Sequence, residues 1–366
     1  MPLAEILREA DRIMTICNAC RYCEGICAVF PAMERRRTFS DKDLIYLSNL
    51  CHNCRGCYYA CQYAPPHEFT VNVPKTLQKL RVKSYVTGVW PSFLTGLFQR
   101  NGLKVLLISL FMVIAVGISV LSKGASVIFA THHGEGVFYR IMPYSGIILI
   151  TALVLLWAVT ALFIGVLRYI DWTGQSLAGL LKILALWRAT GDVLRLRYLG
   201  GGGHGCNYPG EGFSQVRRWF HHLVFYGFIL SLIATALAAY FENIISRVAP
   251  YPFLSPPVIT GTIGGLMLMV GSAGLFFLKL KSDKEPSNPD LIGMDLVFSG
   301  LLFLISLTGL LLLILRETSG MGILFIVHFG LVLGFFLALP YGKFLHALYR
   351  YTALVQNAIE ASNEEP

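Results

Sequence analysis

The sequence predicts a mainly α-helical membrane protein, in which a small N-terminal domain precedes a bundle of six transmembrane helices. Of its 366 residues, 55% are hydrophobic and only 14% are charged, which is outside the usual range for soluble proteins. Six apolar segments each approach the roughly 20 residues needed to cross a bilayer. Eight of the nine cysteines lie between positions 17 and 61. The N-terminal part therefore has a chemistry of its own.

Residues 1–82 are polar enough to form a cytosolic domain. The first 16 residues, MPLAEILREADRIMTI, contain acidic residues and no continuous apolar run, so they do not resemble a secretory signal. We expect the N-terminus to stay in the cytosol. In that reducing compartment, densely spaced cysteines indicate metal ligation rather than disulfides.

The cysteines repeat one spacing, C-x2-C-x2-C-x3-C, twice. In this pattern the fourth cysteine of each run binds the cluster of the other run. The spacing predicts two 4Fe-4S clusters, one held by Cys17, Cys20, Cys23 and Cys61, and one held by Cys51, Cys54, Cys57 and Cys27. Zinc is the less favoured alternative, because structural zinc sites usually pair two short knuckles across a longer loop.

Both runs depart from the bacterial ferredoxin pattern in the same way. Ala28 and Gln62 stand where a proline directly follows the fourth cysteine, and Pro31 and Pro65 come later in each copy. This symmetry suggests an internal duplication. The segment between the runs reads as a helix that starts near Asp41, so we expect the helical type of two-cluster ferredoxin. The strand-rich type is the alternative.

A connector over residues 83–102 leads to a transmembrane domain over residues 103–350, followed by a cytosolic tail over residues 351–366. We place the spans at about 103–121, 145–167, 221–240, 261–280, 293–315 and 321–345. With residue 1 inside, twelve Lys and Arg residues face the cytosol and four face outward. The positive-inside rule therefore predicts a multi-pass protein of the cell (inner) membrane with both termini in the cytosol.

The long inner segment between the second and third spans has two parts. Residues 176–199 carry leucines at helical intervals beside a basic face, which predicts a helix on the membrane surface; a cytosolic helix packed on the N-terminal domain is the alternative. Residues 200–212, GGGGHGCNYPGEG, form an irregular loop that we expect to dock on a partner. Asp295, a lone acid near the fifth span, is expected at the membrane interface.

Histidines on the spans predict a b-type haem, because paired imidazoles are common axial ligands. His221 and His222 begin the third span and His346 ends the sixth. Neighbours on a helix differ by about 100°, so one of the first two should face the haem with His346; His221 is preferred and His222 stays open. The side chains expected to pair with haem propionates are Arg217, Arg218 and Lys343.

His328 lies 18 residues before His346. On one continuous helix that separation is about five turns, or roughly 27 Å, with both side chains on one face. This geometry would allow a second haem in the outer leaflet, although only His132 and His133 lie on that side as partners. The alternative is a histidine that hydrogen-bonds within the bundle.

Four stretches carry a family resemblance: CNACRYCEGICAVFPAMERR, CHNCRGCYYACQYAPPHEF, FHHLVFYGF and PYGKFLHALYR. Together they resemble the tricarballylate (citrate) utilisation protein B family over nearly the whole chain. The resemblance implies a ferredoxin and cytochrome b-like fusion that reoxidises an FAD-dependent tricarballylate dehydrogenase and passes electrons to membrane quinone. It also extends to the C-terminal part of a cobalamin-biosynthesis fusion protein, whose flavoprotein partner acts on a corrinoid.

The sequence thus predicts an electron-transfer subunit rather than a stand-alone enzyme. One alternative runs the electrons from quinol to a cytosolic reductase. Another makes the membrane part a transporter with an iron–sulfur redox sensor, which would want polar groups at mid-membrane. The net charge of +9 is explained by basic residues near membrane segments, so we expect no nucleic-acid partner.

Overall fold

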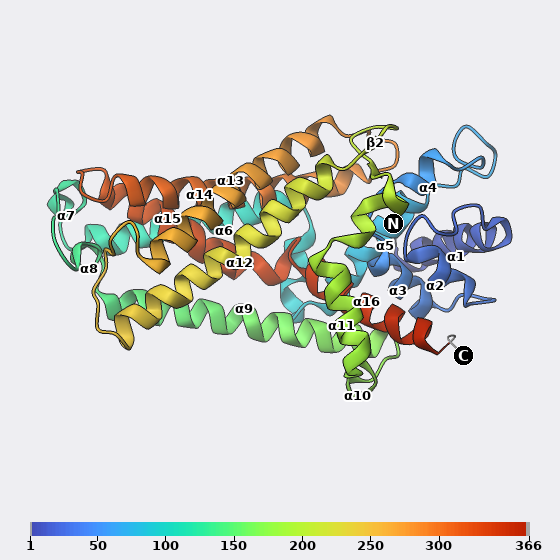
Figure 1. The fold of residues 1–366 in the computed structure, drawn as a ribbon, viewed down its shortest axis with the longest axis horizontal. Helices are drawn as coiled ribbons and strands as arrows, with labels where there is room; N and C mark the ends of the chain where they lie inside the picture. The colour runs from blue at the N-terminus through green and yellow to red at the C-terminus, as the bar shows by residue number, and fades with distance from the viewer. Residues whose placement is uncertain (1, 364–366) are drawn as a thin grey trace.

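The computed structural model describes residues 2–363 and is almost entirely helical, which confirms the predicted fold class. The short helices α1 to α5 gather at one end of the molecule, and the long helices of the bundle extend away from them (Figure 1). In the described chain the only strands are β1 (Cys206–Asn207) and β2 (Phe213–Ser214), which pair antiparallel in the glycine-rich loop.

The N-terminal domain contains α1 (Leu3–Cys20), α2 (Val29–Glu34), α3 (Asp41–Leu50), α4 (Gly56–Tyr59) and α5 (Val73–Gly88). No strand occurs within residues 2–88, so the helical type is confirmed and the strand-rich alternative is wrong. Helix α3 begins at Asp41 as predicted. The Ser40 hydroxyl accepts from the Asp43 N–H while the Asp43 carboxylate accepts from the Ser40 N–H, which is a complete capping box.

Six helical segments are long and apolar enough to cross a membrane, so the chain is a multi-pass membrane protein. They are α6 (Asn101–Leu121), α9 (Tyr144–Trp172), α12 (Val216–Asn243), α13 (Pro256–Lys281), η3 with α14 (Pro289–Leu291 and Ile292–Ile314), and α15 with η4 (Met321–Ala338 and Leu339–Tyr341). The remaining elements are η1 (Ser92–Phe98), α7 (Ala125–Phe129), α8 (Val137–Ile141), α10 (Leu177–Leu180), α11 (Ile183–Leu194), η2 (Arg197–Gly203) and α16 (Leu345–Ser362).

Glycines bring α12 and α13 into close contact. A Cβ atom on Gly264 would lie 2.9 Å from the carbonyl oxygen of Gly227, and one on Gly271 would lie 2.8 Å from that of Phe220. Any larger side chain at these positions would push the two helices apart. The glycine-rich character of the fourth span therefore reflects tight packing against the third.

The sixth span ends earlier than predicted. Helix α15 stops at Ala338, η4 contains Pro340, Gly342 is extended, and α16 begins a new helix at Leu345. Proline lacks a backbone N–H and cannot continue a helix ladder. The prediction that one continuous helix carries both His328 and His346 is therefore wrong, and the 27 Å separation does not follow.

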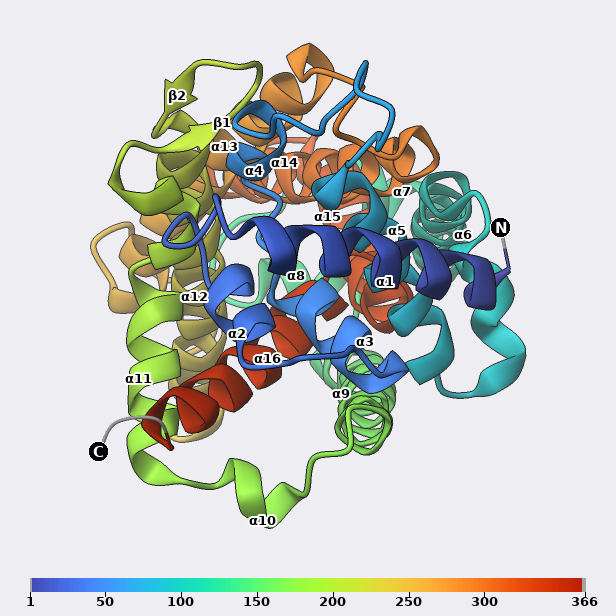
Figure 2. The same cartoon turned by 90° about the vertical axis from the view of Figure 1, so that its right-hand side faces the viewer.

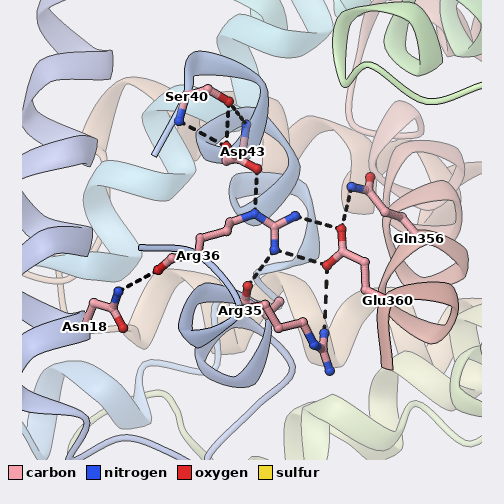
Figure 3. A network of polar contacts seen from close by, with 8 residues as sticks. Asn18, Arg35, Arg36, Ser40, Asp43, Gln356 and Glu360 are labelled. Carbon is pink, nitrogen blue, oxygen red and sulfur yellow. Dashed lines mark hydrogen bonds and ion pairs between the residues drawn. The ribbon is translucent and has the colours of Figure 1, made fainter. Parts of the chain in front are cut away.

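Helix α16 also occupies the region that the sequence suggested as a tail. It packs against α3 and α11 (Figure 2). At its far end the Glu360 carboxylate accepts from Arg36 at 2.7 and 3.1 Å, and Arg36 donates to Asp43 at 2.5 Å (Figure 3). The C-terminal helix is thereby fixed to the cysteine-rich domain, at the same end of the molecule as α1.

Helix α11 runs crosswise to α9 and α12 at the junction between the bundle and the N-terminal domain (Figure 1). It packs on α16 through small buried residues, Ala185 and Ala189, and exposes Ile183, Leu184 and Trp187. Helix α11 therefore contacts the C-terminal helix α16, and its apolar side is not covered by other parts of the described chain. Its location on the membrane surface stays a prediction.

Candidate cofactor sites

The fold brings the fourth cysteine of each run to the other run, as the spacing predicts. The thiol of Cys17 interacts with those of Cys20, Cys23 and Cys61, and these four line one cavity of the N-terminal domain. Cys27, in contrast, interacts with the second run. Two sets of four sulfur donors result, each drawn from both copies.

Each set offers four thiol groups, which is the number and type of ligand that a 4Fe-4S cluster needs. Burial, with a smaller effect from neighbouring cysteines, raises the pKa of Cys17 and of Cys23 to about 12. Iron must therefore displace protons when it binds these thiols. This donor set fits iron–sulfur clusters.

The two runs share a backbone feature but differ in environment. Arg21 and Arg55, at equivalent positions, both have left-handed backbones, with φ of 55° and 67°. Arg21 is exposed, whereas Arg55 is fully buried, stacks on the Tyr208 ring at 4.4 Å and donates to Ser287. Of these two arginines, Arg55 is the one that would place a buried cation beside a cluster.

The second cysteine run is held by the membrane domain. Arg217, at the start of α12, donates to the carbonyl oxygens of Asn53 at 2.7 Å and His52 at 3.2 Å. Arg350, on α16, donates to that of Cys51 at 2.9 Å. Two cations from different helices thus fix the loop that would hold the second cluster.

The glycine-rich loop covers the same run. The N–H of Asn207 donates to the Cys54 carbonyl at 3.0 Å, and Cys206 packs with Cys54 and Leu199 in a buried group. β1 is thereby seated on the chain's own N-terminal domain, and the expected docking of the loop on a partner stays a prediction. Several of its glycines adopt positive φ, a conformation that favours this residue.

A cavity lies between the second cysteine run and helices α12, α13, α14 and α16, with a volume, including its open mouth, of about 1040 Å³. His221 and His346 face each other there, with ring centroids 6.3 Å apart and planes at 69°. Nδ1 of His346 lies 2.5 Å from the Lys343 carbonyl, to which it donates. Its Nε2 is left free as a ligand.

His222 does not share this cavity. Its ring stacks on Tyr226 at a centroid distance of 5.9 Å and lies 6.2 Å from Trp219. Of the two adjacent histidines, the structure therefore brings only His221 to His346. Nδ1 of His221 is buried without a hydrogen-bond partner among the described residues.

Positive charge dominates the cavity. Its wall carries five cations and one acid, namely Arg81, Arg217, Lys279, Lys343, Arg350 and Asp295. Asp295 pairs with both lysines at 2.7 Å, while Nη2 of Arg81 and Nε of Arg350 are buried without partners in the described chain. Burial and the nearby Arg81 lower the pKa of Arg350 to about 9. The site has room for additional negative charge.

These residues fit a b-type haem. The ring centroids of His221 and His346 are 6.3 Å apart, so the two imidazoles could hold one iron atom between them at metal–nitrogen distances of about 2 Å. The unpaired cations suit the two propionate carboxylates. Arg217 and Lys343 line this cavity, whereas Arg218 donates to the carbonyl of Arg195 at 2.7 Å and lies outside it. The structure therefore does not bring Arg218 to this cavity, and its propionate contact stays a prediction.

His328 lies in a different cavity. Its Nδ1 is 3.1 Å from both the Ile305 carbonyl and the Thr308 hydroxyl, and no other histidine lines this second cavity. His132 is elsewhere, with Nε2 2.9 Å from the carbonyl of Val127. The structure thus brings neither outer histidine to His328 as a second ligand.

The residues that sequence reasoning missed at the His221 cavity are His52, Asn53, Arg81 and Arg350. His52 and Asn53 are the two residues between Cys51 and Cys54, so the sequence already indicates that they would lie beside the second cluster. Their position in one cavity with a histidine of α12 depends on how the two domains meet. Asp295, expected at the membrane interface, is a partly buried partner of two lysines, and its depth in the membrane stays a prediction.

Comparisons with known proteins match the N-terminal and C-terminal parts of the chain to separate family models. Residues 96–366 match the family Citrate utilization protein B, and residues 10–87 match its Fer4-like domain. The chain is 43% identical over 359 residues to Citrate utilization protein B of Escherichia coli, covering 98% of this chain and 93% of that protein. No solved structure matches. The cysteine runs and the histidine cavity lie inside these matches, and the chain belongs to the citrate utilization protein B family, with an iron–sulfur domain at its N-terminus.

Proposed function

We propose that this protein carries electrons from a cytosolic FAD-dependent dehydrogenase, of the tricarballylate dehydrogenase type, to quinone in the cell membrane. The path runs through two 4Fe-4S clusters and one b-type haem. The observation that carries the proposal is the shared wall of the histidine cavity: His52 and Asn53 of the second cysteine run line it together with His221 and His346.

Burial supports a direction along this path. The first cysteine set lines a cavity beside Tyr22, which is 71% exposed, so a docked flavoprotein can approach it. The second run is buried against the membrane domain. Electrons would therefore pass from the surface of the N-terminal domain toward the bundle, with that domain and both termini in the cytosol.

Each group on the path has a distinct task. His221 and His346 would hold the iron, Arg81 and Lys343 would face the propionates, and Arg217 fixes the cluster loop. The haem would supply one-electron transfer. The stoichiometry balances: reduced flavin releases two electrons and two protons, the chain passes the electrons singly, and quinone takes up two electrons and two protons to become quinol.

The test is a pyridine-haemochrome and iron assay on the purified protein. Wild type should hold haem b and about eight non-haem irons. His221→Ala and His346→Ala should lose haem and keep iron, while the matched control His222→Ala keeps both. Absence of haem from wild type, or equal haem in all four proteins, would refute the proposed path.

A further inference from the structure

The cavity around His328 lies between α12, α13, α14 and α15 and has a volume, including its open mouth, of about 1100 Å³. It is next to the His221 cavity, because Leu302 lines both. Phe228 and Phe335 line the His328 cavity with ring centroids 6.3 Å apart. A molecule bound here would therefore be the neighbour of one bound between His221 and His346.

Within residues 2–363, no charged side chain lines the His328 cavity, in contrast to the five cations of the neighbouring one. Its polar lining is limited to hydroxyl groups and one imidazole, and the rest is aliphatic, aromatic or glycine. Burying a carboxylate without a cation is costly. This cavity therefore suits a neutral, mostly apolar molecule with few hydrogen-bonding atoms.

The His328 ring is fixed with one nitrogen to spare. A carbonyl oxygen can only accept, so Nδ1 donates to Ile305 and the neutral ring carries its proton there. Gly309 gives the ring space, because a Cβ at that position would lie 2.8 Å from Cε1 of His328. Nε2 has no partner within residues 2–363 and is left to a ligand.

Two further features concern the ligand. The hydroxyl of Thr262 lines the cavity and makes no hydrogen bond within the described chain. Leu232, also in the lining, is 45% exposed on the lipid-facing surface of the bundle. The cavity therefore offers two free polar groups and an approach from the bilayer.

We infer that this cavity binds the head group of a membrane quinone or quinol. Such a molecule is neutral, carries oxygen atoms at opposite ends of its ring and has an apolar tail. Nε2 of His328 accepts a hydrogen bond from a quinol hydroxyl, and the Thr262 hydroxyl can serve the other oxygen. The inference rests on the proposed function, whose electron acceptor it places. A haem fits less well, since its propionates would find no cation and its iron no second histidine.

The experiment uses the full-length protein with its cofactors, reduced and then mixed with decylubiquinone in a stopped-flow spectrometer. Reoxidation of the haem and clusters is followed, with ferricyanide as an acceptor that needs no membrane site. His328→Ala removes the imidazole, and Ala234→Leu fills the cavity. Ala236→Leu, on the exposed side of the same helix, is the matched control.

Both cavity variants should be reoxidised by the quinone about tenfold more slowly or worse and bind it more weakly in fluorescence quenching. Ala236→Leu should behave as wild type, and haem content and the ferricyanide rate should not change. Wild-type quinone rates in both variants would overturn the inference and leave the proposed function standing. Loss of about half the haem in His328→Ala would also overturn it, because His328 would then bind a second haem. A wild type oxidised by ferricyanide but not by quinone would refute the proposed function as well.

Discussion

Replacing Glu360 by glutamine should loosen α16 from the N-terminal domain. The carboxylate accepts two hydrogen bonds from the Arg36 guanidinium, at 2.7 and 3.1 Å, and one from Gln356 at 3.0 Å. The two charged side chains are 13% and 23% exposed. Since His346 sits at the start of the same helix, this contact helps to hold the histidine in register with the cysteine domain.

The exposure of Arg36 and Glu360 determines how much free energy their interaction contributes. Exposed ion pairs contribute about 0–1 kcal/mol, and breaking a buried pair costs about 3–5 kcal/mol. A bidentate, partly buried pair lies between these limits, so Glu360→Gln should cost about 2 kcal/mol. That is about a 30-fold increase in the local opening equilibrium, since 1.4 kcal/mol is tenfold.

Hydrogen–deuterium exchange measures this opening directly. Peptides from the second half of α16 should exchange about 30-fold faster in Glu360→Gln than in wild type. Glu9→Gln is the matched control, because Glu9 pairs with Arg12 at 2.7 Å but both side chains are about 40% exposed. Equal exchange of α16 in the two variants would show that the Arg36 contact does not hold the helix.

Three further outcomes are expected. Asp295→Asn leaves Lys279 and Lys343, whose side chains are 9% and 27% exposed, facing each other without the carboxylate, so it should cost about 2 kcal/mol in thermal unfolding and reduce haem retention; an unchanged melting temperature would contradict the pairing. Gly271→Ala should cost about 1–3 kcal/mol by separating α12 from α13, whereas Gly293→Ala, with nothing within 4 Å, should cost nothing. Burial raises the pKa of Asp43, but hydrogen bonds from Ser40 and Arg36 outweigh it and lower the pKa below 3.8. Its stabilisation is thus present above pH 3.8 and lost as pH falls through the folded-state pKa, and Asp43→Asn should lose less stability on acidification.

Features encoded by local chemistry could be predicted from the sequence. The exchange of Cys27 and Cys61 between the runs follows from spacing alone, because in this pattern the fourth cysteine, which comes after three intervening residues, binds the cluster of the other run. The start of α3 follows from its first residues. The rotation between neighbours on a helix predicts that only one of His221 and His222 faces His346, but the choice of His221 needed the structure.

Features made by tertiary packing could not be predicted in this way. Arg350 was one of the basic residues counted on the cytosolic side of the membrane. Its hydrogen bond to the Cys51 carbonyl depends on α16 passing beside that residue. The break between α15 and α16 was concealed by hydropathy, since the residues around it remain apolar. Pro340 and Gly342 were the available signal, because both residue types interrupt helices.

Charge explains why one bundle needs two differently lined cavities. A cofactor with carboxylates, such as haem, would be stable beside the cysteine domain, where N–H groups of Arg81 and Arg350 have no partner in the described chain. It would be unstable in the His328 cavity, because no charged side chain of the described residues lines that cavity. A neutral molecule from the bilayer has the opposite preference, because entering the first cavity would leave those cations unpaired. On the proposed function, the lining would separate a resident anionic group from an exchangeable neutral one, with the resident group between the cysteine domain and the His328 cavity. Moving a single cation into the second cavity, for example by Ser306→Lys, should abolish quinone reoxidation while leaving haem content unchanged.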